Sequence, residues 1–157
     1  MPELRSLRGS AAARELLSRF RNVAIVGLSD DPTRPSYGVG HYLVAQGYRV
    51  TPVNPNVDSV FGIQAVPTLD DVPDELEIVN VFRRREAIPG VVDDAIEAGA
   101  QAIWLQMGLA DNASETRARA AGLAVVRNRC IKVDHRAWFG GAARRAERWR
   151  AGLDDDR

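Results

Sequence analysis

Two serines and an arginine follow the first apolar run of the chain, at 22–28, and together they could bind an anion. These residues are Ser29, Arg34 and Ser36, and Tyr37 comes next. We expect a helix to begin near Ser36, and the first backbone amides of a helix are free to donate hydrogen bonds. Hydroxyls, a guanidinium and such amides are groups that bind phosphate. The alternative is that the serines only shape the loop and that Arg34 is solvated.

The second apolar run, at 48–53, ends in Asn54 and Pro55. A dinucleotide-binding fold that takes NAD usually has Asp or Glu at this place, where the carboxylate accepts from the ribose hydroxyls. A carboxylate would repel a phosphorylated ribose, whereas an asparagine would not. Asn54 therefore favours coenzyme A or NADP over NAD. The alternative is that Asn-Pro only terminates the strand.

Three consecutive arginines follow another buried run, at 77–82. Such runs are often solvated, but this one comes directly after an expected strand. We expect Arg83 to contact a ligand and Arg84 or Arg85 to lie in solvent. Phe82 could pack on an adenine ring or close the core.

Gln106 and Cys130 also follow expected strands. The amide of Gln106 could hydrogen-bond a ligand carbonyl, or it could be an ordinary polar loop residue. Cys130 is the candidate nucleophile, because Arg129 and Lys132 would favour a thiolate if they face it. No acidic residue is placed to orient His135 as a catalytic triad requires. The alternative is a buried, unreactive cysteine.

Strands and helices alternate along the chain, which predicts a doubly wound parallel sheet, an α/β fold of three layers. Ligands of such sheets bind at the carboxyl ends of the strands. We expect one domain over 1–157, with a core at about 15–137. The expected strands are 22–28, 48–53, 66–67, 77–82, 102–105 and 123–126. The expected helices are 10–20 (begun by Ser10), 36–47, a brief helix capped by Thr68, 86–98, 112–121 and 140–150.

Composition excludes several classes of function. The 157 residues carry a formal net charge of +0, so no overall field draws the chain to nucleic acid or an acidic membrane. Lys132 is the only lysine, which excludes a Walker A phosphate loop. One cysteine and two histidines make a metal cluster improbable. The single cysteine, the lack of a signal peptide and the lack of a long apolar span favour the cytoplasm.

Six segments, in this order and spacing, resemble the small CoA-binding-domain proteins, whose fold is similar to the amino-terminal domain of the succinyl-CoA synthetase alpha subunit. The resemblance covers roughly residues 15 to 137. It implies a Rossmann-like fold that holds coenzyme A, with the ADP part over the first loop. The synthetase's catalytic histidine belongs to a downstream domain that this chain lacks, so we do not expect ligase chemistry. The segments are Gly27–Ser29, Arg34–Tyr37, Gly47–Pro55, Val81–Arg83, Trp104–Gly108 and Asn128–Lys132.

We therefore expect a protein that binds coenzyme A or a short acyl-CoA at the carboxyl edge of the sheet, without catalysis of its own. An NADP-dependent oxidoreductase and a ligand-sensing adaptor are the alternatives, and a homodimer stays open. The expected ligand-binding residues are Gly27, Ser29, Arg34, Ser36, Tyr37, Asn54, Pro55, Phe82, Arg83, Gln106, Gly108, Arg129 and Cys130.

Overall fold

A five-stranded parallel sheet forms the centre of the molecule, with the strand order β2-β1-β5-β6-β7. The computed structural model describes residues 3–140. Apolar runs that are buried on both faces produce these strands, as expected of a parallel sheet. The strands are β1 (Asn22–Val26), β2 (Arg49–Val53), β5 (Ile78–Val81), β6 (Ala102–Leu105) and β7 (Ala124–Val126).

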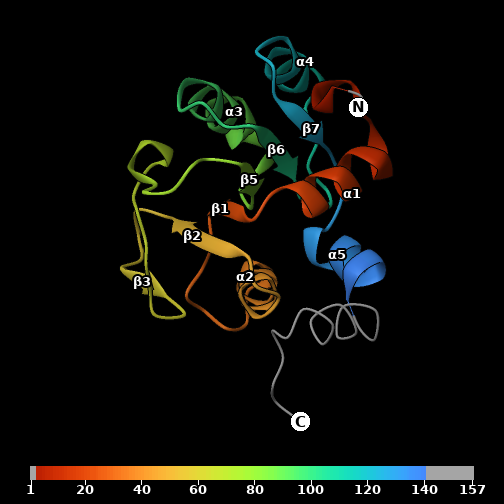
Figure 1. Cartoon of the computed structure of the whole chain (residues 1–157). Helices are drawn as coiled ribbons and strands as arrows, with labels where there is room; N and C mark the ends of the chain where they lie inside the picture. The colour runs from red at the N-terminus through yellow and green to blue at the C-terminus, as the bar shows by residue number, and fades with distance from the viewer. Residues whose placement is uncertain (1–2, 141–157) are drawn as a thin grey trace.

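Helices cover both faces of the sheet, so the expected three-layer α/β fold is confirmed (Figure 1). Helices α1, α2 and α5 pack on one face, where Leu16, Leu43 and Ile131 are fully buried. Helices α3 and α4 pack on the other face, around Val92 and Ala118. Among the described residues, no helix has the length and apolar character needed to cross a membrane. The α-helices are α1 (Gly9–Arg19), α2 (Pro35–Ala45), α3 (Ile88–Glu97), α4 (Asn112–Ala120) and α5 (Ile131–Phe139).

The connection between β2 and β5 differs from the expected one. Val66 forms a single parallel bridge with Val53 instead of an expected strand at 66–67. A small antiparallel hairpin, which the sequence did not predict, precedes it. The brief helix expected after Thr68 is a single 3₁₀ turn with Thr68 in the N-cap position. The Thr68 side chain forms no capping hydrogen bond with the backbone, and its hydroxyl donates to Asp71 Oδ2 at 2.7 Å. The hairpin consists of β3 (Ser59–Val60) and β4 (Ile63–Gln64), and the short 3₁₀ turns are η1 (Leu4–Ser6), η2 (Leu69–Asp71) and η3 (Arg85–Ala87).

Two helix expectations need correction. The first helix begins at Gly9 with Arg8 in the N-cap position, so Ser10 lies inside it. Helix α5 was not expected, although it packs against α1 and α2. The expected helix at 140–150 lies almost wholly outside the described residues.

The strand order reverses beside β1. The chain runs from β1 to its neighbour β2 on one side and then returns to β5 on the other side (Figure 1). Crossovers that leave β1 in opposite directions open a crevice between the loops that follow β1 and β5. The position at which ligands bind in folds of this kind is therefore where the residues after Val26 and Val81 meet.

Candidate functional site

Four of the expected ligand residues form one row across the carboxyl edge of the sheet. The strand register aligns the last residues of β2, β1, β5 and β6. The next residue of each strand therefore lies beside its neighbour, at a strand spacing of about 4.8 Å. From the β2 side, the residues of this row are Asn54, Gly27, Phe82 and Gln106.

Gly27 brings the first loop against the end of β5. Its φ is +88°, and a Cβ at this position would lie 2.1 Å from the Phe82 carbonyl oxygen and 3.1 Å from Arg83 Cδ. Only a residue without a side chain can take this conformation and this close approach. The 3.1 Å distance to Arg83 Cδ shows that the Arg83 side chain lies over the loop, next to the crevice.

A hollow of about 320 Å³ opens above Gly27, between the loop and the start of α2. It brings together Ser29, Arg34 and Ser36 with Phe82, as the sequence predicted; Pro35 also lines it. Arg34 is exposed, and no carboxylate among the described residues forms an ion pair with it. The nearby Asp31 interacts with Arg34 through its charge but forms no ion pair with it, so the guanidinium at the mouth of the hollow keeps its donors available for a ligand.

The two serine hydroxyls hold the loop in shape as acceptors. Ser36 Oγ accepts from Ser29 N at 3.0 Å, and Ser29 Oγ accepts from Asp31 N at 3.0 Å. Each hydroxyl hydrogen has no acceptor among the described residues, so both hydroxyls can still donate to an anion. Hydrogen bonds from Thr33, and then the charge of Arg34, lower the pKa of Asp31.

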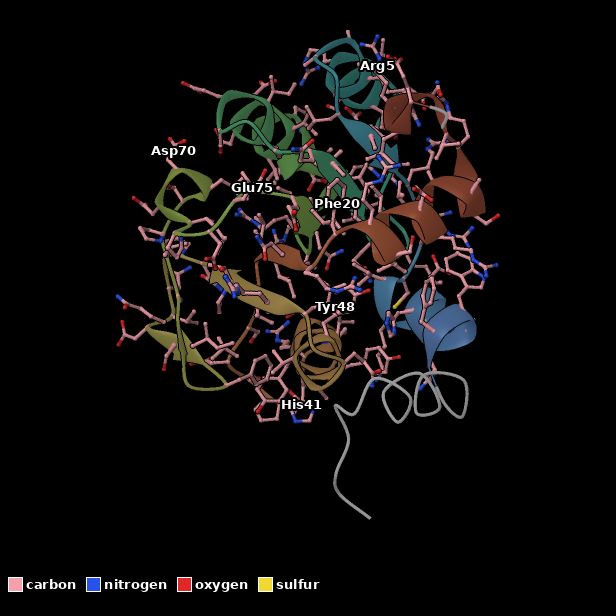
Figure 2. The ribbon with its side chains drawn as sticks, viewed as in Figure 1. Arg5, Phe20, His41, Tyr48, Asp70 and Glu75 are labelled. Atoms are coloured by element: carbon pink, nitrogen blue, oxygen red, sulfur yellow. The ribbon has the colours of Figure 1, made fainter. Side chains whose placement is uncertain are left out.

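The start of α2 offers fewer free amides than the sequence suggested. Pro35 is the first helical residue and has no N–H, and Tyr37 N donates to Arg34 O at 3.1 Å. The Tyr37 ring packs instead against Phe61 of the hairpin, with 4.7 Å between ring centroids. His41 lies in the same aromatic group, exposed on the outer surface of α2 (Figure 2).

Asn54 joins the loops that follow β1 and β2. Its Nδ2 donates to Leu28 O at 3.0 Å, and its Oδ1 accepts from Asn56 N at 2.9 Å. Pro55 is exposed beside it. Asn54 therefore fixes the edge of the crevice, and no carboxylate stands at this position.

Gln106 is buried, with 6% of its surface exposed. Its Oε1 accepts from Asn80 Nδ2 at 3.0 Å and from Ile131 N at 3.1 Å. Asn80 is a site neighbour that the sequence analysis missed. The sequence feature that could have revealed Asn80 is that it is the single amide side chain in the otherwise apolar strand Ile78–Val81.

The loops after β6 and β7 bond to each other. Gly108 has a φ of +90°, and its N–H donates to Asn128 Oδ1 at 2.7 Å. Arg129 binds both carboxylate oxygens of Asp134, at 2.7 and 3.0 Å, and this hydrogen bonding raises the pKa of Arg129. The Arg129 guanidinium, which is partly exposed, is thus already paired, whereas that of Arg34 has no such partner.

Cys130 occupies the N-cap position of α5 and is half-buried. His135 is buried and shares a 2.8 Å hydrogen bond with the Tyr42 hydroxyl. In residues 3–140, no group of three or more His, Cys, Asp or Glu side chains could hold a metal ion. The groups that could bind an anion are those at the hollow, namely Arg34 and the hydroxyls of Ser29 and Ser36.

A larger hollow, of about 500 Å³, lies along the outer side of β2. Val44, Tyr48, Val50 and Ile63 line it, together with the ion pair between Arg49 and Asp74. It lies beside the edge strand and away from the strand carboxyl ends. Size alone does not make it the better candidate for an anion, because Asp71 also lines it and its one arginine, Arg49, is already paired with Asp74.

A parallel sheet of this strand order with helices on both faces belongs to the class of Rossmann-like α/β proteins. Within that class, the chain belongs to the family of CoA binding domains, whose model matches residues 21–136. The resemblance inferred from the sequence motifs is thereby confirmed.

Known relatives agree with this assignment. The chain is 39% identical over 125 residues to the uncharacterized protein YneT of Bacillus subtilis, covering 80% of this chain and 93% of YneT. A hypothetical protein from Pyrococcus horikoshii OT3 has a similar structure, with a TM-score of 0.79 and 34% identity over 87% of this chain and 96% of that one. An ADP-forming acetate–CoA ligase of Archaeoglobus fulgidus is 26% identical over 81 residues, which are 50% of this chain and 12% of the ligase.

Proposed function

We propose that the protein binds coenzyme A or a short acyl-CoA in the crevice between the ends of β1 and β5, without catalysing a reaction of its own. The hollow above Gly27 carries this proposal, because Arg34 and two serine hydroxyls converge there without an internal anion. Membership of a CoA-binding-domain family supports the choice of ligand.

The phosphates of the ligand fit the charged side of the crevice. Arg34 at the mouth and Arg83 over the loop can each form charge-assisted hydrogen bonds to phosphate oxygens. Ser29 and Ser36 add hydroxyl donors at the base. Asn54 leaves the ribose side of the crevice neutral, which suits a ribose that carries a phosphate.

Calorimetric titration with CoA, dephospho-CoA, NADP and NAD tests the ligand. We expect CoA to bind most tightly and NAD most weakly, because dephospho-CoA and NAD lack the ribose phosphate. Binding of NAD as tight as that of CoA would reject the assignment. Tightest binding of NADP would instead favour a role in hydride transfer.

Arg34→Ala tests the phosphate contact. Loss of a charge-assisted hydrogen bond should weaken CoA binding by about 1.5–3 kcal/mol, or roughly 10- to 150-fold in Kd. Arg49→Ala is the matched control, because Arg49 is an exposed arginine at the opposite end of β2 and lines the larger hollow. Unchanged affinity in Arg34→Ala would remove Arg34 from the site, and a loss in Arg49→Ala would move the site to the β2 side.

A further inference from the structure

Gln106 lies one strand away from the hollow, in the same row as Phe82. Val81 and Leu105 are register partners, so Phe82 and Gln106 lie beside each other at the ends of β5 and β6. A ligand that fills the hollow next to Phe82 and continues along the edge of the sheet reaches Gln106 next.

The start of α5 fixes the orientation of the Gln106 amide. Ile131 N–H can only donate, so the group that faces it, at 3.1 Å, has to be Oε1 of Gln106. The same oxygen then requires a donor from Asn80, and Asn80 Nδ2 faces it at 3.0 Å. Both amides are therefore oriented by one backbone N–H, without freedom to turn over.

This arrangement leaves two polar atoms without partners. Asn80 Oδ1 is fully buried and accepts no hydrogen bond from any described residue. Gln106 Nε2, the other end of its amide group, donates to no described residue. A buried acceptor without a donor destabilises the folded state. Asn80 nevertheless supplies the second donor to Gln106 Oε1, so Nε2 is the end of the Gln106 amide that is left to donate to a ligand.

We propose that Gln106 determines specificity for the arm of the ligand, by donating a hydrogen bond from Nε2 to a carbonyl oxygen of that arm. The inference rests on the proposed function and extends it. The arm of CoA contains amide carbonyls, and an acyl-CoA adds a thioester carbonyl. Asn80 is the positioning residue, because it acts on the ligand only through the orientation of Gln106.

Gln106→Glu isolates the donor. A glutamate oxygen can still accept from Asn80 Nδ2 and Ile131 N, but the second oxygen would repel a carbonyl oxygen. We expect CoA to bind at least about tenfold more weakly to Gln106→Glu, a loss of one hydrogen bond to a neutral partner plus repulsion. Adenosine 3′-phosphate 5′-diphosphate, the nucleotide half without the arm, should bind as it does to the wild type. Gln101→Glu is the matched control, because Gln101 is exposed at the opposite end of β6.

Acetyl-CoA distinguishes the two sources of the carbonyl. Equal losses for CoA and acetyl-CoA in Gln106→Glu assign the hydrogen bond to an amide of the arm, and a greater loss for acetyl-CoA assigns it to the thioester. Equal losses for CoA and for the nucleotide half, or no loss for CoA and acetyl-CoA alike, would overturn the inference. Absence of CoA binding by the wild type would instead refute the proposed function.

Asn80→Leu tests the positioning role by a second route. It removes the unpartnered oxygen, so the midpoint of thermal unfolding should stay the same or rise. It also removes one of the two donors that hold Gln106 Oε1, so the Gln106 side chain is fixed by Ile131 N–H alone and is less firmly placed. Affinity for CoA should therefore fall while affinity for the nucleotide half is kept. A variant with unchanged stability and unchanged CoA affinity would contradict a positioning role for Asn80. Should this variant not fold, Gln106→Glu still decides the specificity role.

Discussion

Arg34 and Arg129 have the same side chain but different surroundings. Arg129 is bound by both oxygens of Asp134 and lies 5.7 Å from the centre of the Trp138 ring. Arg34 has no carboxylate partner among the described residues and stands at the mouth of the hollow. Both were expected at the site because both follow strands. The sequence could not distinguish them, because the partner of Arg129 lies on a helix that was not expected.

Gly27 is the residue on which the close approach of the two loops depends. We expect Gly27→Ala to lower the free energy of unfolding by about 2–4 kcal/mol, since the methyl group would clash with the Phe82 carbonyl and φ is positive. CoA binding should be lost with the loop geometry. Chemical denaturation and calorimetry measure the two effects.

Gly90→Ala is the control for this substitution. Gly90 lies in α3, and a Cβ there would meet no atom within 4 Å. This variant should be about 0.5–1 kcal/mol more stable, because alanine favours a helix. A Gly27→Ala protein as stable as the wild type would contradict the described loop geometry.

At the scale of elements, the parallel strands were predicted well because each is a short apolar run. The errors lie at their ends. Glu77 was expected to begin a strand, but its carboxylate accepts from Arg21 N and Asn22 N at 3.0 and 2.8 Å. Glu77 thus supports the start of β1 through its side chain, a role that no local pattern reveals.

The missed elements lack a simple apolar pattern. Helix α5 buries Asp134 and His135 beside Ile131, so its inner face carries polar groups. Their partners, Arg129 and Tyr42, make this burial acceptable and become visible only in the fold. Strands β3 and β4 have two residues each, too short to produce an alternation of apolar and polar residues.

The row of site residues could be predicted, because the carboxyl ends of parallel strands lie along one edge. The roles within the row could not. Asn54 was expected to position a nucleotide, and what the structure shows is that it joins two loops. The orientation of Gln106 depends on Asn80 and on the start of α5, which are distant in sequence.

At the scale of the whole molecule, two hollows compete for the ligand, and hydrogen exchange can separate them. We expect CoA to slow exchange at 27–37, 82–85 and 106–109, since ligand binding suppresses local opening at the carboxyl edge. The segments around Val44 and Ile63, which line the larger hollow, should keep their exchange rates. Protection at Val44 and Ile63 alone would place the ligand beside β2.

The outer side of β2 also determines how copies of the chain can meet. An exposed edge strand can pair with a neighbouring molecule through its backbone. Here Pro52 has no N–H, its carbonyl accepts from Val66 N at 2.9 Å, and Asn54 N donates to Val66 O at 2.9 Å. A second copy would have to displace the segment that contains Val66 before one of its strands could pair with β2 at Pro52 and Asn54. The carboxyl end of β2 is therefore closed to a partner strand, and pairing between two sheets would have to use another part of the edges, such as the outer side of β7.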